Sequence, residues 1–294
     1  MKKLKIKKSM LSHLLPGLTS LTKRGLAGWL VIFGAILVIA VIVMTALSPW
    51  IAPHDPSALT VGPRLSPPST QFPFGTDDLG RDMLSRVISG GGVMLQVAIL
   101  SVIVCLIIGV PLGLFSSHTG GVIDRFISLI MDSVYAFPGF ILAIAFTVVL
   151  GRGVINMALS IAVVYVPSYF RIIRSQVLSI KEMSYIEAAN AAGARKRTVL
   201  LRYILPNVVP SIAVVATVNF ADAILTAAGL TFIGMGVPVN IPDWGWDLTN
   251  GRNLLPSGAW WVITFPGLMI ILLALGFTLM GEGLSELLSP KLEE

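Results

Sequence analysis

Charged residues are scarce in this chain of 294 residues. They make up 12% of the sequence, whereas 55% of it is hydrophobic and the mean hydropathy is +0.85. Soluble domains usually carry about 25% charged residues. A soluble protein of this length would need far more polar surface, so the composition predicts a polytopic membrane protein.

The residues and motifs of most enzyme sites are also missing. There are three scattered histidines and one cysteine, and neither an H-E-x-x-H nor a G-x-S-x-G motif occurs. The dipeptide Gly-Lys never occurs, which excludes a P-loop. Cys105 has no partner for an intrachain disulfide. We therefore expect no catalytic site, no metal site and no cofactor in this chain; ATP and Mg²⁺, if used, would belong to another subunit.

Long apolar runs are what the sequence does contain. A membrane-spanning helix needs roughly 20 mostly apolar residues. Transmembrane β-strands would instead give many alternating segments of about ten residues. The runs here are continuous, so an all-α protein with six transmembrane helices is predicted, at residues 28–48, 93–115, 130–150, 154–173, 208–233 and 261–280.

The basic residues predict how these spans are oriented. One side would hold residues 1–27, 116–129, 171–207 and the tail after 281, with 16 of the 21 Lys and Arg residues. Because cytosolic loops are enriched in Lys and Arg, both termini should be cytosolic. The basic residues are dispersed along membrane-flanking segments, which argues against a nucleic-acid partner.

The same topology divides the rest of the chain. It predicts a basic cytosolic N-terminus (1–27), a proline-rich outer loop (49–92), a cytosolic loop (174–205), a second outer loop (234–260) and a cytosolic tail (282–294). The first of these, with five lysines in its first eight residues, is expected to anchor on anionic lipid.

Two outer segments contain recognisable local patterns. In FGTDDLGRDMLSR (74–86), Thr76 is expected to cap a short helix that begins with Asp77 and Asp78. In the second outer loop and just after it, four tryptophans fit an interfacial aromatic belt or a roof over a central pathway: Trp244, Trp246, Trp260 and Trp261.

Asp222 is the most unusual residue of the predicted spans. It lies mid-span, with Asn219 three residues earlier on the same helical face. An acidic residue at this depth should face a bundle interior or water. It is either a pathway or gating residue or a hydrogen-bonded packing link between helices. A third reading makes the protein an ion-coupled secondary transporter that uses Asp222.

The cytosolic loop contains the clearest local signal. Ser184-Tyr185-Ile186-Glu187 has the S-x-x-E form of a capping box, with a helix expected over 185–192. Gly193 stands where a left-handed C-terminal cap is favoured, and a second short helix should begin at Arg195. The short side chains of Ala188, Ala189 and Ala192 allow another protein to approach this helix closely. Tyr185 and Ile186 offer apolar anchors. This pattern favours a docking surface over a plain linker.

The same residues resemble a family motif. The series Glu187-Ala188-Ala189, Gly193, Leu205-Pro206 is similar to the EAA loop of permease subunits of binding-protein-dependent ABC importers. Tyr203 stands where the family usually has isoleucine. The outer motif FGTDDLGRDMLSR and the segment GLTFIGMGVPVNIPDWG resemble the C-type permeases of dipeptide, oligopeptide and nickel importers. Relatives commonly carry a glutamate where this chain has Ala227.

The resemblance implies a type I ABC importer permease fold and a set of partners. These are a second, different permease, two ATPase subunits docked on the cytosolic loop and an extracytoplasmic substrate-binding protein, all at the cell membrane. Peptides are the first expected substrate, and nickel or a metal chelate the second. The residues implied in ATPase coupling are Tyr185, Ile186, Glu187, Ala188, Ala189, Ala192, Gly193, Arg195, Leu205 and Pro206.

Overall fold

The structure is a computed structural model that describes residues 25–238 and 240–288. Within these residues the regular elements are helices, with one isolated bridge between Thr76 and Asp82. The predicted lipid-anchoring segment at the N-terminus and the last residues of the tail lie outside the described residues. The principal helices are α3 (Leu26–Ala46), α5 (Met83–Thr119), α6 (Gly121–Tyr135), α7 (Gly139–Leu150), α8 (Val154–Lys181), α9 (Ser184–Ala191), α11 (Leu205–Phe232), α12 (Trp244–Leu254) and α13 (Trp261–Leu288).

Four short elements complete the described part of the chain. They are α4 (Ser48–Ile51), α10 (Lys196–Val199), the π turn η2 (Leu200–Ile204) and the 3₁₀ turn η3 (Leu255–Ser257). Five continuous helices are long and apolar enough to cross a membrane, and the bent pair α6–α7 makes a sixth if it counts as one span. Several helices continue past the predicted spans, because their polar ends extend beyond the apolar run that defined each span.

The third span differs from its prediction. A single helix over 130–150 was expected, but α6 and α7 meet at an angle of 90°. Pro138 lies at the break as the residue before α7, and Gly139 follows it. Proline disfavours helical backbone at the residue before it, here Phe137, so the chain turns where the apolar run showed no interruption.

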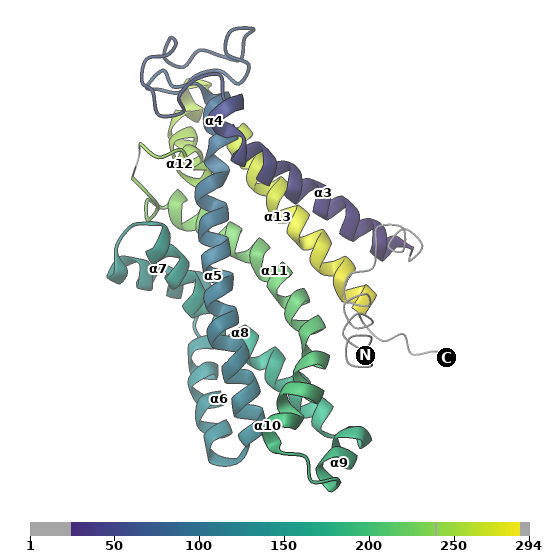
Figure 1. Cartoon of the computed structure of the whole chain (residues 1–294). Coiled ribbons are helices and arrows are strands. Elements are labelled where there is room, and N and C mark those ends of the chain that lie inside the picture. Colours follow the sequence, from purple (N-terminus) through teal and green to yellow (C-terminus); the bar gives the residue numbers. More distant parts are fainter. Residues whose placement is uncertain (1–24, 239, 289–294) are drawn as a thin grey trace.

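Small residues let the long helices approach closely. A Cβ on Gly34 of α3 would lie 2.5 Å from the carbonyl oxygen of Gly276 on α13. On α5, Cβ atoms at Gly109 and Gly113 would lie 2.7 and 2.9 Å from side chains of α8. Such small-residue contacts are typical of membrane helix pairs. Figure 1 shows α3 and α13 running side by side.

A buried ion pair joins α5 and α12 at one end of the molecule. Arg86 near the start of α5 donates through Nε to Asp247 of α12 at 2.8 Å, and both side chains are fully buried. Arg86 also donates to the carbonyl oxygen of Pro56 at 3.0 Å, which ties the proline-rich loop to both helices. Figure 1 shows this loop and α12 together at the end opposite α9 and α10.

The predicted cap at Thr76 is wrong. The Thr76 hydroxyl is used inside the loop, where it accepts from the Ser66 amide at 2.9 Å. Asp82 caps α5 instead and accepts from the Ser85 amide at 3.1 Å. Asp77 holds the turn between them, accepting from the Arg81 amide at 2.9 Å and from its guanidinium.

The tryptophans do not form one interfacial belt. Trp244 is fully buried and donates to the Val87 carbonyl at 2.8 Å, and Trp261 is buried and donates to the Thr76 carbonyl at 2.9 Å. Trp260 is half exposed. Trp244 therefore fixes α12 to α5, and Trp261 fixes the proline-rich loop to α13, a role that composition alone did not separate from an aromatic belt.

Candidate functional site

Helix α9 begins one residue earlier than predicted and without a capping box. Its N-cap is Met183, and no side chain hydrogen-bonds the free amides of the first turn. Ser184 is already helical, so its hydroxyl is not in the position from which an N-cap side chain reaches the third helical residue. The amides of Ile186 and Glu187 bond the Met183 carbonyl at 2.9 and 3.3 Å instead. Glu187 stays exposed and keeps its carboxylate for other contacts.

The C-terminal end of α9 follows the prediction. Gly193 has φ 76°, the left-handed conformation that glycine adopts at little cost. The Ala194 amide bonds the Ala189 carbonyl at 3.0 Å, and the Gly193 amide bonds the Asn190 carbonyl at 2.9 Å. These two bonds form a Schellman motif, which ends the helix sharply and sets the direction of the chain toward α10.

The exposed face of α9 consists of small and charged side chains. Glu187, Ala188 and Ala192 are exposed, Ala189 is half-buried, and Arg195 is exposed beyond the turn. Side chains this short let another backbone approach closely. The geometry therefore suits a partner groove that takes in a narrow helix.

Ile186 does not belong to that face, contrary to the prediction. It is 1% exposed and packs in the chain's own core with Val177 and Ile180 of α8, Val199 of α10 and Ile204 of the π turn. Ile186 thus holds α9 against the neighbouring ends of two spans. The burial of Ile186 could not be predicted from the loop alone, because the four residues that cover it come from three different elements.

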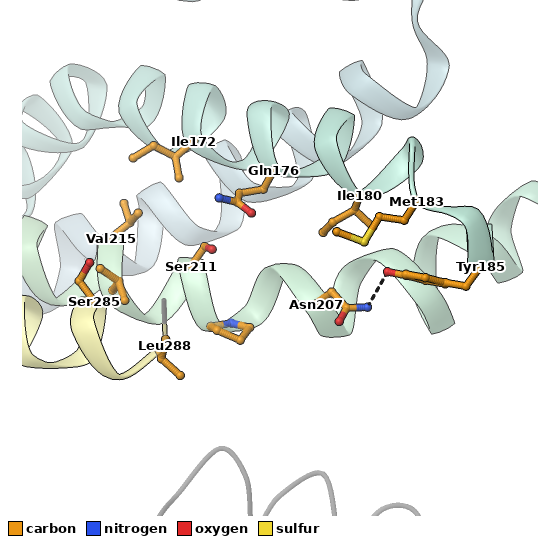
Figure 2. Close-up of a pocket in the computed structure, with 12 residues that line it drawn as sticks. Ile172, Gln176, Ile180, Met183, Tyr185, Asn207, Ser211, Val215, Ser285 and Leu288 are labelled. Atoms are coloured by element: carbon orange, nitrogen blue, oxygen red, sulfur yellow. Dashed lines mark hydrogen bonds between the residues drawn. The ribbon is translucent and has the colours of Figure 1, made fainter. Parts of the chain in front are cut away.

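Tyr185 makes a second connection from α9 to α11. Asn207 donates to the Tyr185 hydroxyl at 3.3 Å and to the Tyr203 carbonyl at 2.6 Å. Figure 2 shows this bond at one end of a cavity of about 480 Å³ between α8, α11 and α13. Gln176 and Ser211 also point into it. A shift of α9 would act on α11 through this bond as well as through Ile186.

The second short helix, α10, is shorter than predicted and is not separate from the fifth span. Residues from Lys196 to Phe232 form one continuous helical path with a π turn at Leu200–Ile204. Pro206 is the second residue of α11 but lies inside this continuous path, so its missing N–H interrupts the backbone hydrogen bonding directly after the π turn. Leu205 and Pro206 are half-buried. Tyr203, the departure from the family pattern, lies in the π turn.

A partly buried ion pair ties α6 to α8. Arg174 of α8 binds Asp124 of α6 through two hydrogen bonds of 2.7 and 2.6 Å, and Ser116 of α5 donates to the same carboxylate at 2.6 Å. Lys181 donates to the Ser117 carbonyl at 3.0 Å. This network could not be predicted from the sequence, because its members are dispersed over three helices.

Asp222 and Asn219, predicted to share a helix face, line one cavity. It has a volume of about 360 Å³ and lies where the break between α6 and α7 meets α8 and α11. Tyr165 of α8 and Thr226 of α11 are hydrogen-bonded across it at 3.1 Å. In the described part of the chain no hydrogen bond or ion pair involves Asp222, which argues against its reading as a packing link. Leu205 and Pro206, two of the residues implied in coupling, lie at the start of α11, whereas Asn219 and Asp222 lie farther along it.

Comparison with known proteins agrees with this arrangement. Residues 109–294 match the family model described as "Binding-protein-dependent transport system inner membrane component". A dipeptide transport system permease protein of Alkalihalophilus pseudofirmus is 39% identical over 90% of this chain and 86% of its own. A probable D,D-dipeptide transport system permease protein of Escherichia coli K12 is 38% identical over 89% and 88%.

Two further relatives extend the comparison. The glutathione transport system permease protein of Pectobacterium atrosepticum is 36% identical over 92% of this chain and 90% of its own. Among solved structures, an inward-facing MetNI methionine ABC transporter chain matches with a TM-score of 0.57 at 19% identity, covering 71% of this chain and 98% of that one. The last likeness concerns the fold. The chain belongs to the binding-protein-dependent transport system inner membrane components, and it is a multi-pass, non-catalytic permease subunit of an ABC importer.

Proposed function

We propose that this permease imports short peptides. The observation that carries the proposal is the kind of substrate named for its relatives, which are dipeptides, a D,D-dipeptide and glutathione, over nearly their whole length. The polar cavity beside the broken span supports it, since a peptide in transit needs hydrogen-bonding groups within the membrane. Nickel or a metal chelate is the competing substrate, and the uptake assay below separates the two.

The permease works as one half of a pathway, paired with a second and different permease chain. Tyr135, Phe137 and Phe140 at the break of the bent span are exposed in this chain, and they lie beside the polar cavity. A cavity with a carboxylate cannot face lipid cheaply, so this side faces the partner permease and the pathway. An extracytoplasmic binding protein delivers the peptide at the end closed by α12.

ATPase subunits, which bind ATP and Mg²⁺, dock on α9. The surface consists of Glu187, Ala188, Ala189, Ala192, Gly193 and Arg195. Tyr185 and Ile186 pass the movement inward to α8 and α11, and Leu205 and Pro206 carry it into the fifth span. This docking places α9 and both termini in the cytosol, as the distribution of basic residues favours.

Uptake by the complete importer tests this function. The permease pair, ATPases and binding protein are reconstituted in liposomes, and ATP-dependent uptake of labelled Ala-Ala is compared with uptake of a nickel chelate. We expect uptake of the dipeptide alone, unaffected by ionophores that collapse ion gradients. Uptake of the chelate alone, or dependence on an ion gradient, would contradict the proposal. Glu187→Ala and Gly193→Pro should weaken ATPase retention or uncouple hydrolysis from uptake.

A further inference from the structure

The cavity beside the broken span combines one acid with neutral polar groups and aromatic rings. Asp222 and Asn219 line it from α11, Ser168 from α8, and Tyr135, Phe137 and Phe140 from the two sides of the break. Asn219 is 5% exposed, so it lies at the inner wall, whereas Phe137 is 62% exposed and lies at the outer edge. The charge therefore lies in a recess behind an aromatic rim.

No basic residue of the described chain compensates this charge. Arg171 lies on α8 one turn beyond Ser168, but its guanidinium is bound to Asp132 at 3.1 and 3.0 Å. The same guanidinium lies over the Tyr135 ring, 4.4 Å from its centroid. The hydroxyls of Tyr165 and Thr226 are bonded to one another. The Asp222 carboxylate is left half-buried, with its acceptor oxygens unused by the described residues.

The chemistry of this recess selects a particular kind of ligand. A carboxylate within a membrane protein is costly unless it is paired or hydrated. An ammonium group has three donors, which match the carboxylate, the Asn219 side-chain carbonyl and a hydroxyl. Aromatic faces attract the same cation. A metal ion fits less well, because no group of three His, Cys, Asp or Glu side chains occurs among the described residues.

We propose that this cavity binds a primary ammonium group, the amino terminus of a peptide in transit, with Asp222 as its counter-charge. This rests on the proposed import of peptides. The volume of the cavity, about 360 Å³, lies within the usual range for small-ligand pockets. Asp222 then sets a preference for substrates with a free amino terminus within the permease itself, in addition to any selection by the binding protein.

Direct binding to the permease–ATPase complex without the binding protein tests this assignment. Ala-Ala and N-acetyl-Ala-Ala are titrated in parallel by saturation-transfer NMR. We expect Ala-Ala to bind about tenfold more tightly, as for a charge-assisted hydrogen bond. Asp222→Asn should abolish that difference, and Asp222→Glu should retain part of it. Equal binding of both peptides to the unaltered complex, or a preference that survives in Asp222→Asn, would overturn the proposal.

Two controls keep the result specific. Glu282→Gln removes an exposed carboxylate of α13 outside the cavity and should leave the preference unchanged. Each variant must elute as an intact complex with unchanged thermal stability. Uptake by the complete importer is measured separately, so that a failure of peptide import and a failure of the Asp222 assignment give different results. Normal peptide uptake by Asp222→Asn, with an unchanged preference for Ala-Ala over N-acetyl-Ala-Ala, counts only against Asp222.

Discussion

At the scale of single residues, α9 presents two faces with different tasks. The exposed side chains, among them Ala188 and Ala192, are short enough for a partner to approach, while Ile186 is buried against α8, α10 and the π turn. A helix of this length is marginal in isolation, so its position depends on that buried contact. Under the proposed docking, Ile186 is one of two residues, with Tyr185, through which a force on α9 would reach the membrane helices.

Replacing Ile186 by alanine tests that role. Truncation of a buried isoleucine leaves a cavity and costs about 2–5 kcal/mol, whereas Ile186→Val costs about 0.5–1.5 kcal/mol. We expect Ile186→Ala to loosen α9, so that the ATPases still hydrolyse ATP while peptide uptake per ATP falls severalfold. Ile186→Val should stay close to the unaltered importer. Equal coupling in Ile186→Ala and the unaltered protein would contradict this account.

Gly193 offers a second test at the same scale. An L-residue with a Cβ at φ 76° costs about 1–2 kcal/mol, so Gly193→Ala should weaken the Schellman turn. Asparagine tolerates this conformation better, so Gly193→Asn should lose less. Hydrogen exchange of the α9 amides measures the effect. We expect exchange to be slowest in the unaltered protein, faster in Gly193→Asn and fastest in Gly193→Ala. Identical protection in all three proteins would show that the turn does not hold α9.

At the scale of elements, the sequence predicted long apolar helices well and their ends poorly. Span positions follow from apolar runs, which are local. The break at Pro138 interrupts no apolar run, so it could not be seen in the hydropathy. Asp82 rather than Thr76 caps the helix because the Thr76 hydroxyl is already bonded within the loop. The capping box failed because Ser184 entered the helix, while Gly193 was predictable because its backbone conformation is specific to glycine.

Helix α12 gives a prediction for pH. Asp243 caps it, accepting from the Gly245 and Trp246 amides, and burial, with a smaller effect of nearby Asp247, raises the pKa of Asp243 to about 7. Between its ordinary value of about 4 and 7, the folded protein holds a proton that the unfolded chain has lost, so stability falls as pH rises through this range. Well above pH 7, Asp243 is deprotonated in both states, and it no longer makes stability depend on pH.

Asp243→Asn isolates this effect. Asparagine also caps helices but does not titrate, so the variant should keep the bonds and lose this pH dependence. We expect the Tm of the unaltered protein to fall relative to that of the variant between pH 5 and pH 8. Thermal unfolding in detergent measures both. A constant difference in Tm across this range would show that Asp243 does not titrate there.

At the scale of the whole molecule, α9 and the cavity at Asp222 are connected through two helices. Tyr185 and Ile186 link α9 to the nearby ends of α8 and α11, and the same two helices carry residues that line the cavity. The opposite end is held by the buried pair of Arg86 and Asp247. Under the proposed docking, a movement applied at α9 would act on the walls of the cavity through α8 and α11.

Contact between α9 and an ATPase subunit is the most direct test of this account. A photo-reactive benzoylphenylalanine replaces Ala188 in the complete importer, and the same group at Leu59, an exposed outer position, serves as the control. After illumination the crosslinked partners are identified by mass spectrometry. The account predicts an adduct between position 188 and an ATPase subunit and none at position 59; an intact importer with no ATPase adduct at position 188 would contradict it.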